Sequence, residues 1–298
     1  MQIEGTVCPM LTPTASHDPE IDREGLRSYT RFLVEGGVDG LFPCGSIGEF
    51  SSLTPDQRRA VFEEVVDAAD GGPVLAGCGD TSVESVLGHV ENAANAGADA
   101  AVVVTPYYLN TTQPGLERFF RAVADRAELP IVLYNIPALT GERLSRELVT
   151  QLAIQDGVVG IKDTSGDLTY LYDIVRETPD DFFVLQGATE LTVASLKVGA
   201  DGVVAGPANI FPERVSAVFD QHQRGKTDRT RAIMNEVVNP IVSATADLPT
   251  AAAIKHLLSV AGHDVGGPLP PLPDLTPSER AELKSCYERI TALADVPH

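Results

Sequence analysis

Short apolar runs rich in β-branched residues recur along the first 206 residues of the chain, separated by longer segments of mixed polarity. Their apolar character is continuous rather than alternating, which is typical of parallel strands buried on both faces. We therefore expect strands at residues 5–11, 40–45, 73–79, 100–106, 130–137, 158–163, 182–187 and 202–206.

The segments between these runs have the spacing and the end signals of helices. In residues 22–37 the apolar positions repeat at helical spacing and stop at a Gly-Gly pair, which predicts a helix with a glycine C-cap. Thr54 followed by Pro55 predicts the start of the next helix. Eight such units in about 220 residues predict an α/β fold, the (β/α)8 TIM barrel. A doubly wound parallel sheet is the alternative, although the chain has no G-x-G-x-x-G fingerprint.

The strand signals stop beyond the eighth run. Residues 226–262 and 276–294 have helical patterns, and the proline-rich segment GGPLPPLPDL, residues 266–275, connects them. We therefore predict a (β/α)8 barrel catalytic domain over residues 1–225 and a C-terminal helical subdomain over residues 226–298.

The net charge of the chain limits the binding partners and the cellular environment that we expect. The 42 acidic residues outnumber the 22 basic ones, which gives a net charge of −20. Such a surface repels nucleic acid and anionic membranes, so we expect a small-molecule substrate, no nucleic acid and no membrane. Few lysines and no tryptophan favour a halophilic protein, with an ordinary acidic protein as the alternative. No secretory signal is visible at the N-terminus, so we predict a cytoplasmic location.

The cysteines and histidines suggest neither a metal site nor a thiol nucleophile. Cys8, Cys44, Cys78 and Cys286 form no CxxC pair, and no histidine lies at metal-ligand spacing. We expect free thiols that fill the core. Neither a Ser-His-Asp nor a Cys-His site has support in the sequence.

One lysine lies near the end of a run that is otherwise apolar. Lys162 lies in VVGIKDTSGD, residues 158–167, and lysine is rarely buried without a partner. Active sites of α/β barrels form at the C-terminal ends of the strands. Desolvation there favours a neutral amine, which attacks a ketone to form a Schiff base. A salt-bridged lysine at the barrel rim is the alternative.

Other strand ends supply the groups that imine chemistry needs. The preceding strand contains Tyr134, whose hydroxyl is suited to moving protons. In CGSIGE, residues 44–49, glycines flank Ser46 and allow backbone N–H groups to point at a carboxylate. Together these groups describe a site for a 2-oxo acid, of which pyruvate is the smallest candidate. Each also has a structural alternative, as a core aromatic or an ordinary turn.

Several segments together resemble the dihydrodipicolinate synthase/N-acetylneuraminate lyase family of pyruvate-dependent class I aldolases. They are GSIGE (45–49), TPYY (105–108), YNIPALTG (134–141), GIKDTSGD (160–167), GATE (187–190) and GADGVVAG (199–206). The resemblance covers essentially the whole chain, and the spacing from Tyr134 to Lys162 matches the family. It implies a TIM barrel with C-terminal helices, usually a homotetramer, that works as an aldehyde-lyase with no metal and no organic cofactor.

The resemblance also assigns a role to each candidate residue. Lys162 resembles the Schiff-base lysine, Tyr134 the tyrosine that moves protons, and Tyr108 a tyrosine lent across a dimer interface. The other candidates would bind substrate: Gly45, Ser46 and the backbone at Ile47 at the pyruvate carboxylate, Gly187, Val204 and Ala205 around the pyruvyl group, Leu139 at the aldehyde partner, and Thr164, Thr189 and Glu190 at sugar hydroxyls.

Two departures from the family pattern bear on the substrate. Ile47 stands where the family often has a second hydroxyl residue. Leu139 stands where the synthases have an arginine that binds aspartate semialdehyde. We expect this leucine to be buried. Its side chain cannot make the charged, bidentate contact that an arginine makes with a carboxylate. We therefore expect reversible cleavage of 2-keto-3-deoxygluconate or 2-keto-3-deoxygalactonate to pyruvate and glyceraldehyde.

Several alternatives to this substrate assignment stay open. They are a 4-hydroxy-tetrahydrodipicolinate (dihydrodipicolinate) synthase that condenses pyruvate with aspartate semialdehyde, an N-acetylneuraminate lyase, and a sugar-acid dehydratase that uses the same imine. A non-catalytic barrel that binds a small ligand is the alternative from another class.

Overall fold

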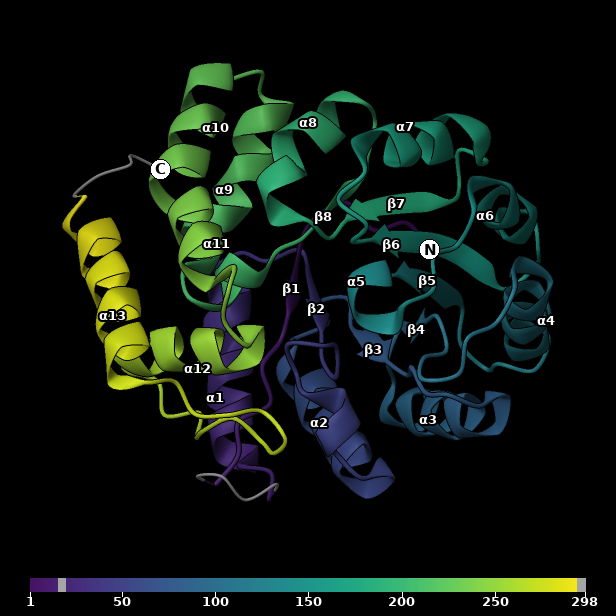
Figure 1. Ribbon diagram of the computed structural model, residues 1–298, viewed down its shortest axis with the longest axis horizontal. Helices are drawn as coiled ribbons and strands as arrows, with labels where there is room; N and C mark the ends of the chain where they lie inside the picture. The colour runs from purple at the N-terminus through teal and green to yellow at the C-terminus, as the bar shows by residue number, and fades with distance from the viewer. Residues whose placement is uncertain (16–19, 294–298) are drawn as a thin grey trace.

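The computed structural model describes residues 1–15 and 20–293 and arranges the strands as a parallel barrel (Figure 1). Within these residues eight strands run in the order β2-β1-β8-β7-β6-β5-β4-β3, and a bridge between Leu41 and Val74 joins β2 to β3. The strands are β1 (Gly5–Pro9), β2 (Gly40–Phe42), β3 (Leu75–Gly77), β4 (Ala100–Val104), β5 (Ile131–Asn135), β6 (Val158–Asp163), β7 (Phe183–Gln186) and β8 (Gly202–Val204). The predicted TIM barrel is confirmed, because β1 pairs with both β2 and β8.

Helices cover the outside of the barrel, and most begin at a residue whose side chain caps the helix. Thr54 and Gln57 form a capping box at the start of α2, as the Thr-Pro signal predicts. The covering helices are α1 (Arg23–Glu35), α2 (Pro55–Ala68), α3 (Val83–Ala96), α4 (Gln113–Ala124), α6 (Arg146–Ala153), α7 (Leu168–Glu177), α8 (Thr192–Lys197) and α9 (Pro212–Gln223). Shorter helical segments follow strands at the rim: Phe50–Ser52, α5 (Pro137–Thr140), Thr189–Leu191 and Gly206–Asn209.

The C-terminal helices lie together on one side of the barrel, with α13 at the outer edge (Figure 1). They are α10 (Thr227–Ile233), a π-helix (Met234–Val238), α11 (Asn239–Thr245), α12 (Thr250–Val260) and α13 (Pro277–Ala292). The π-helix lies just before Pro240, which has no N–H to donate to the carbonyl four residues earlier. The division at residue 225, between α9 and α10, stays a prediction.

The apolar core forms two layers separated by the strands. Side chains inside the barrel form one cluster, which includes Phe42, Val104, Tyr134 and Leu185. A larger cluster lies between the strands and the helices. Since successive strand residues point to opposite faces, each strand contributes to both layers.

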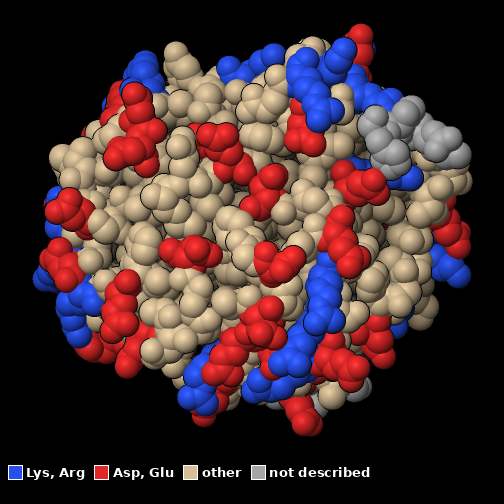
Figure 2. All heavy atoms as spheres, turned by 180° about the vertical axis from the view of Figure 1, so that it is seen from behind, with Lys and Arg blue, Asp and Glu red and all other residues tan. Residues whose placement is uncertain are grey.

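Charged side chains are spread over the face of the molecule that Figure 2 shows. On the face shown in Figure 2, acidic groups lie among uncharged and basic ones, without one continuous patch of either sign. In residues 1–15 and 20–293 no helix combines the length and the apolar character that a membrane span requires.

Candidate active site

Lys162 lies at the end of β6 with its side chain inside the barrel. Its Nζ is 4.1 Å from the centre of the Tyr134 ring and 4.9 Å from that of Phe42. Lys162 and Tyr134 are register partners on β6 and β5, and Lys162 is only 6% exposed. No carboxylate is recorded within ion-pair distance of Nζ among the described residues. The amine therefore lies in an aromatic, nearly dry environment, where the alternative of a salt-bridged rim lysine does not hold.

Tyr134 and Ser46 line one narrow cavity at the ends of β2 to β5. It is lined by Phe42, Cys44, Gly45, Ser46, Phe50, Gly77, Gly79, Val102, Val104 and Tyr134. A Cβ on Gly77 would lie 2.0 Å from the carbonyl oxygen of Cys44, so only glycine allows the turn to approach β3 this closely. The structure thus brings together Gly45, Ser46 and Tyr134 as the sequence predicts.

The turn after β2, residues 44–49, is held in an unusual backbone conformation. Cys44 and Glu49 have φ of 54° and 55°, which is uncommon for residues with a side chain. The hydroxyl of Thr12 donates to the carbonyl of Gly48 at 2.8 Å, and the N–H of Glu49 donates to the carbonyl of Ser46 at 3.2 Å. Non-glycine residues in this region cluster at functional sites, because the surrounding structure must hold them there.

Two glycines at the strand ends lie close to Thr164 and Ile47, which are among the remaining substrate candidates. A Cβ on Gly187 would lie 2.0 Å from Oγ1 of Thr164, and one on Gly206 would lie 3.3 Å from Cδ1 of Ile47. Oγ1 of Thr164 is buried and makes no hydrogen bond to the described residues. Such an atom is suited to a ligand hydroxyl. Val204, Ala205 and Thr189 are buried at the ends of β8 and β7.

Three candidates point to solvent instead. Tyr108 is 91% exposed, with φ of 77°, and Leu139 on α5 is 67% exposed. Glu190 is exposed as well. The expectation that Leu139 is buried was wrong: α5 is a single turn on the barrel rim, where a single chain offers nothing to cover its side chain.

Sequence reasoning did not identify the polar layer behind Tyr134 and Lys162. The next residue on each strand is polar and buried, and Nδ2 of Asn135 donates to Oδ1 of Asp163 at 2.7 Å. Oδ1 of Asn135 accepts from the N–H of Leu144, and Oδ2 of Asp163 accepts from the hydroxyl of Ser165. Burial raises the pKa of Asp163, although these hydrogen bonds oppose the shift. The YN and KD dipeptides were the available signal, since a polar residue on the helix-facing side of a buried strand needs a partner.

The cysteines are buried and free, as expected. Desolvation raises the pKa of Cys44, which lines the cavity, to about 12, and it raises the pKa of Cys8 and Cys78 well above the ordinary value. These thiols are therefore protonated at neutral pH and poor nucleophiles. In the cavity region this leaves the amine of Lys162 as the nucleophile that the geometry favours.

Comparisons with known proteins agree with this fold. The profile of the Dihydrodipicolinate synthetase family matches residues 2–290. The chain is 35% identical to a 4-hydroxy-tetrahydrodipicolinate synthase of Methanopyrus kandleri, over 99% of this chain and 98% of that protein. It is 36% identical to an uncharacterized DapA-like lyase of Halobacterium salinarum, over 95% and 92%.

Solved structures give the same result. A prophage protein of E. coli K12 from the dihydrodipicolinic acid synthase family, crystallised with pyruvate, superposes with a TM-score of 0.92 at 30% identity, over 98% of this chain and 99% of that one. Dihydrodipicolinate synthase DapA-2 of Bacillus anthracis gives a TM-score of 0.93 at 27% identity, over the full length of both chains. This chain therefore belongs to the dihydrodipicolinate synthetase family and is a pyruvate-dependent carbon–carbon lyase of the class I aldolase type.

Proposed function

We propose that the protein cleaves 2-keto-3-deoxygluconate or 2-keto-3-deoxygalactonate reversibly to pyruvate and glyceraldehyde. The observation that supports the chemistry is the buried amine of Lys162 against the Tyr134 ring, beside the cavity that Ser46 lines. The bound pyruvate of the E. coli relative supports a three-carbon oxo acid as ligand.

The proposed reaction uses these groups in turn. Nζ of Lys162 attacks the C2 ketone, and loss of water gives a protonated imine. The hydroxyl of Tyr134 gives its proton to the departing water, and the resulting phenolate takes the proton from the C4 hydroxyl as the C3–C4 bond breaks. The electron pair of that bond moves into the imine to form an enamine, and glyceraldehyde leaves. Protonation of the enamine at C3 and hydrolysis of the imine then release pyruvate and the free lysine.

Binding groups for the rest of the substrate surround this centre. The hydroxyl of Ser46 and the N–H of Ile47 would bind the carboxylate, and Gly187, Val204 and Ala205 would enclose the pyruvyl group. Thr164, Thr189 and Glu190 would bind sugar hydroxyls, and the unpaired buried Oγ1 of Thr164 supports this role. A site that hydrogen-bonds hydroxyls rejects substrates that lack them.

Leu139 supports the first of the two candidate functions. Its side chain cannot pair with a carboxylate on the aldehyde partner, which favours a neutral aldehyde such as glyceraldehyde. The second candidate is condensation of pyruvate with aspartate semialdehyde. It is favoured by the relatives, because five proteins of 33–35% identity are named 4-hydroxy-tetrahydrodipicolinate synthase.

Trapping with borohydride tests this proposal directly. The protein would be incubated with 2-keto-3-deoxygluconate and borohydride in molar KCl, because the excess of acidic residues predicts a halophilic protein. The adduct would then be mapped by mass. We expect a pyruvyl-sized adduct on Lys162, because cleavage and imine formation occur at one residue. An adduct from pyruvate but none from the sugar acid would reject the substrate. The same protein would then be assayed with pyruvate and aspartate semialdehyde.

The exposure of Tyr108 leads to a prediction about the oligomeric state of the protein. A tyrosine that is 91% exposed and strained at φ 77° has no evident role in one chain, so we infer that it completes the site of a second copy in a homotetramer. We expect Tyr108→Phe to lower turnover roughly tenfold or more without changing the size of the assembly in solution.

Mixing of chains distinguishes this role from a local one. Lys162→Ala and Tyr108→Phe chains, combined and reassembled, should recover activity, since some sites then have both an intact lysine and an intact partner tyrosine. Tyr172→Phe, at another partly exposed tyrosine, is the matched control. If the mixture is no more active than the sum of its parts, Tyr108 does not act across an interface.

A further inference from the structure

A buried ion pair joins the turn at residues 44–49 to the C-terminal helices. Glu49 ends this turn, and Lys255 lies on α12. Nζ of Lys255 is 2.6 Å from Oε2 of Glu49, and the two side chains are 1% and 0% exposed. Among the salt bridges of the described residues, this is the one in which both side chains are almost completely buried.

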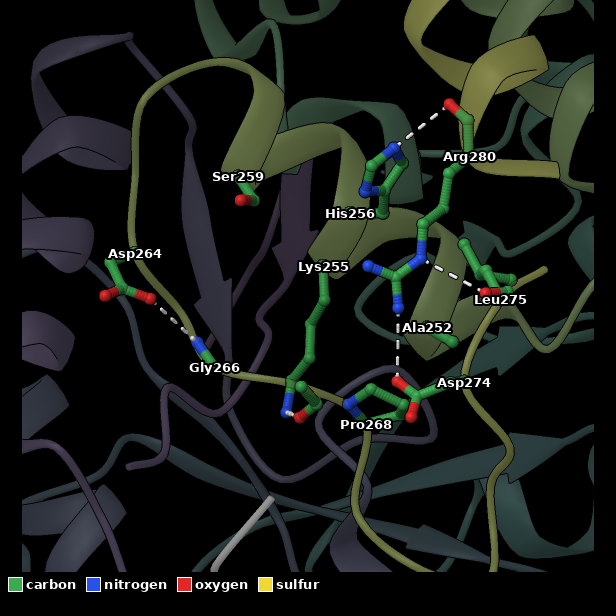
Figure 3. A pocket seen from close by; sticks show the side chains of 11 residues that line it. Ala252, Lys255, His256, Ser259, Asp264, Gly266, Pro268, Asp274, Leu275 and Arg280 are labelled. Atoms are coloured by element: carbon green, nitrogen blue, oxygen red, sulfur yellow. Dashed lines mark hydrogen bonds and ion pairs between the residues drawn. The ribbon is translucent and has the colours of Figure 1, made fainter. Parts of the chain in front are cut away.

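The pair is tied to the connector between α12 and α13 by further hydrogen bonds. Nζ of Lys255 donates to the carbonyl of Gly267 at 2.8 Å, and the N–H of Leu269 donates to Oε1 of Glu49 at 2.6 Å. The hydroxyl of Ser52 donates to the carbonyl of Pro270 at 3.0 Å. Figure 3 shows the Lys255 side chain running from α12 to the connector, apart from the contacts between His256 and Arg280. Both carboxylate oxygens of Glu49 thus have fixed partners.

A buried ion pair is weak evidence for a contribution to stability, which favours a geometric role for this one. Burial of two charges removes them from water, and apolar side chains of similar volume often stabilise a fold equally well. Desolvation lowers the pKa of Lys255, while the Glu49 carboxylate opposes that shift. Glu49 is also the residue that holds φ of 55°, so its side chain fixes a backbone conformation that is otherwise disfavoured.

We propose that Glu49 and Lys255 are positioning residues, which hold the Ser46 hydroxyl and the Ile47 N–H in the orientation that binds the pyruvate carboxylate. The inference rests on the proposed function. Glu49 does not line the cavity, whereas Gly45 and Ser46 of the same turn do. The C-terminal helices therefore contribute to catalysis by fixing the anion-binding turn from behind.

The test separates pyruvate affinity from imine chemistry. Borohydride inactivation would be followed at increasing pyruvate concentration, which gives a half-saturating concentration and a limiting rate. The variant is Glu49→Gln combined with Lys255→Met, because removal of both charges leaves no unpaired buried charge. We expect the half-saturating concentration to rise about tenfold or more, with a limiting rate within about threefold of wild type.

Controls distinguish this effect from loss of stability. Glu64, on α2, is another buried glutamate, and it pairs with Arg23 and Arg27. Glu64→Gln removes this charge and should leave pyruvate affinity unchanged. If the double variant does not fold, Glu49→Gln combined with Lys255→Gln is measured, since it removes both charges and keeps polar side chains that can hydrogen-bond. A folded variant with wild-type half-saturation overturns the inference. A wild-type protein that forms no pyruvate adduct overturns the proposed function and this inference with it.

Discussion

Replacement of Lys162 by alanine should abolish covalent trapping of pyruvate and lower turnover by at least about 10⁴-fold. The nucleophile forms the imine on which every later step depends, so other residues of the site cannot compensate for its loss. The cavity should survive, because Tyr134 and Phe42 pack on each other at 6.2 Å between ring centres without the lysine. Mass spectrometry after borohydride treatment and a pyruvate-release assay measure the two effects.

Lys197 offers a matched control for this substitution. It is exposed on α8, so Lys197→Ala removes one positive charge of the same kind without touching the cavity. Activity and adduct should match the unmodified protein. A Lys162→Ala protein that cleaves substrate at close to the wild-type rate would refute the imine mechanism as a whole.

Replacement of Tyr134 by phenylalanine should lower kcat by about 10²–10⁴-fold, the usual contribution of a positioned acid–base group. The ring is retained, so its contacts with Nζ of Lys162 and with Phe42 should persist. Pyruvate should therefore still saturate the site at a similar concentration, while cleavage of the C3–C4 bond slows. Steady-state kinetics and the borohydride inactivation rate separate these two quantities.

Tyr170 is the corresponding control. Its buried hydroxyl donates to the carbonyl of Leu144 at 2.8 Å, outside the barrel interior. Tyr170→Phe should cost about 1 kcal/mol of stability and leave kcat unchanged. Equal losses of kcat in the Tyr134 and Tyr170 variants would show that a general loss of stability, not proton transfer, explains the effect.

The sequence predicted the strands well because their signals are local. A continuous apolar run predicts a buried parallel strand, and the order of the runs places Tyr134 beside Lys162. Contacts between residues far apart in the chain leave no such pattern. Two such contacts are known only from the folded structure. They are the approach of the Lys162 amine to the Phe42 ring and the ion pair of Glu49 with Lys255. The exposure of Leu139 was missed for a related reason, since an apolar residue in a short rim turn looks like core until its surroundings are known.

The pairing of β1 with β8 has a consequence for how the chain folds. Val7 is the register partner of both Gly40 and Val204, so one edge of the first strand stays open until most of the chain has been synthesised. Such long-range pairing slows folding, because distant segments must meet before their contacts stabilise anything. An unpaired strand edge also invites association with other chains. The N-terminal half of this chain is thus the part most exposed to such association until β8 is available for pairing.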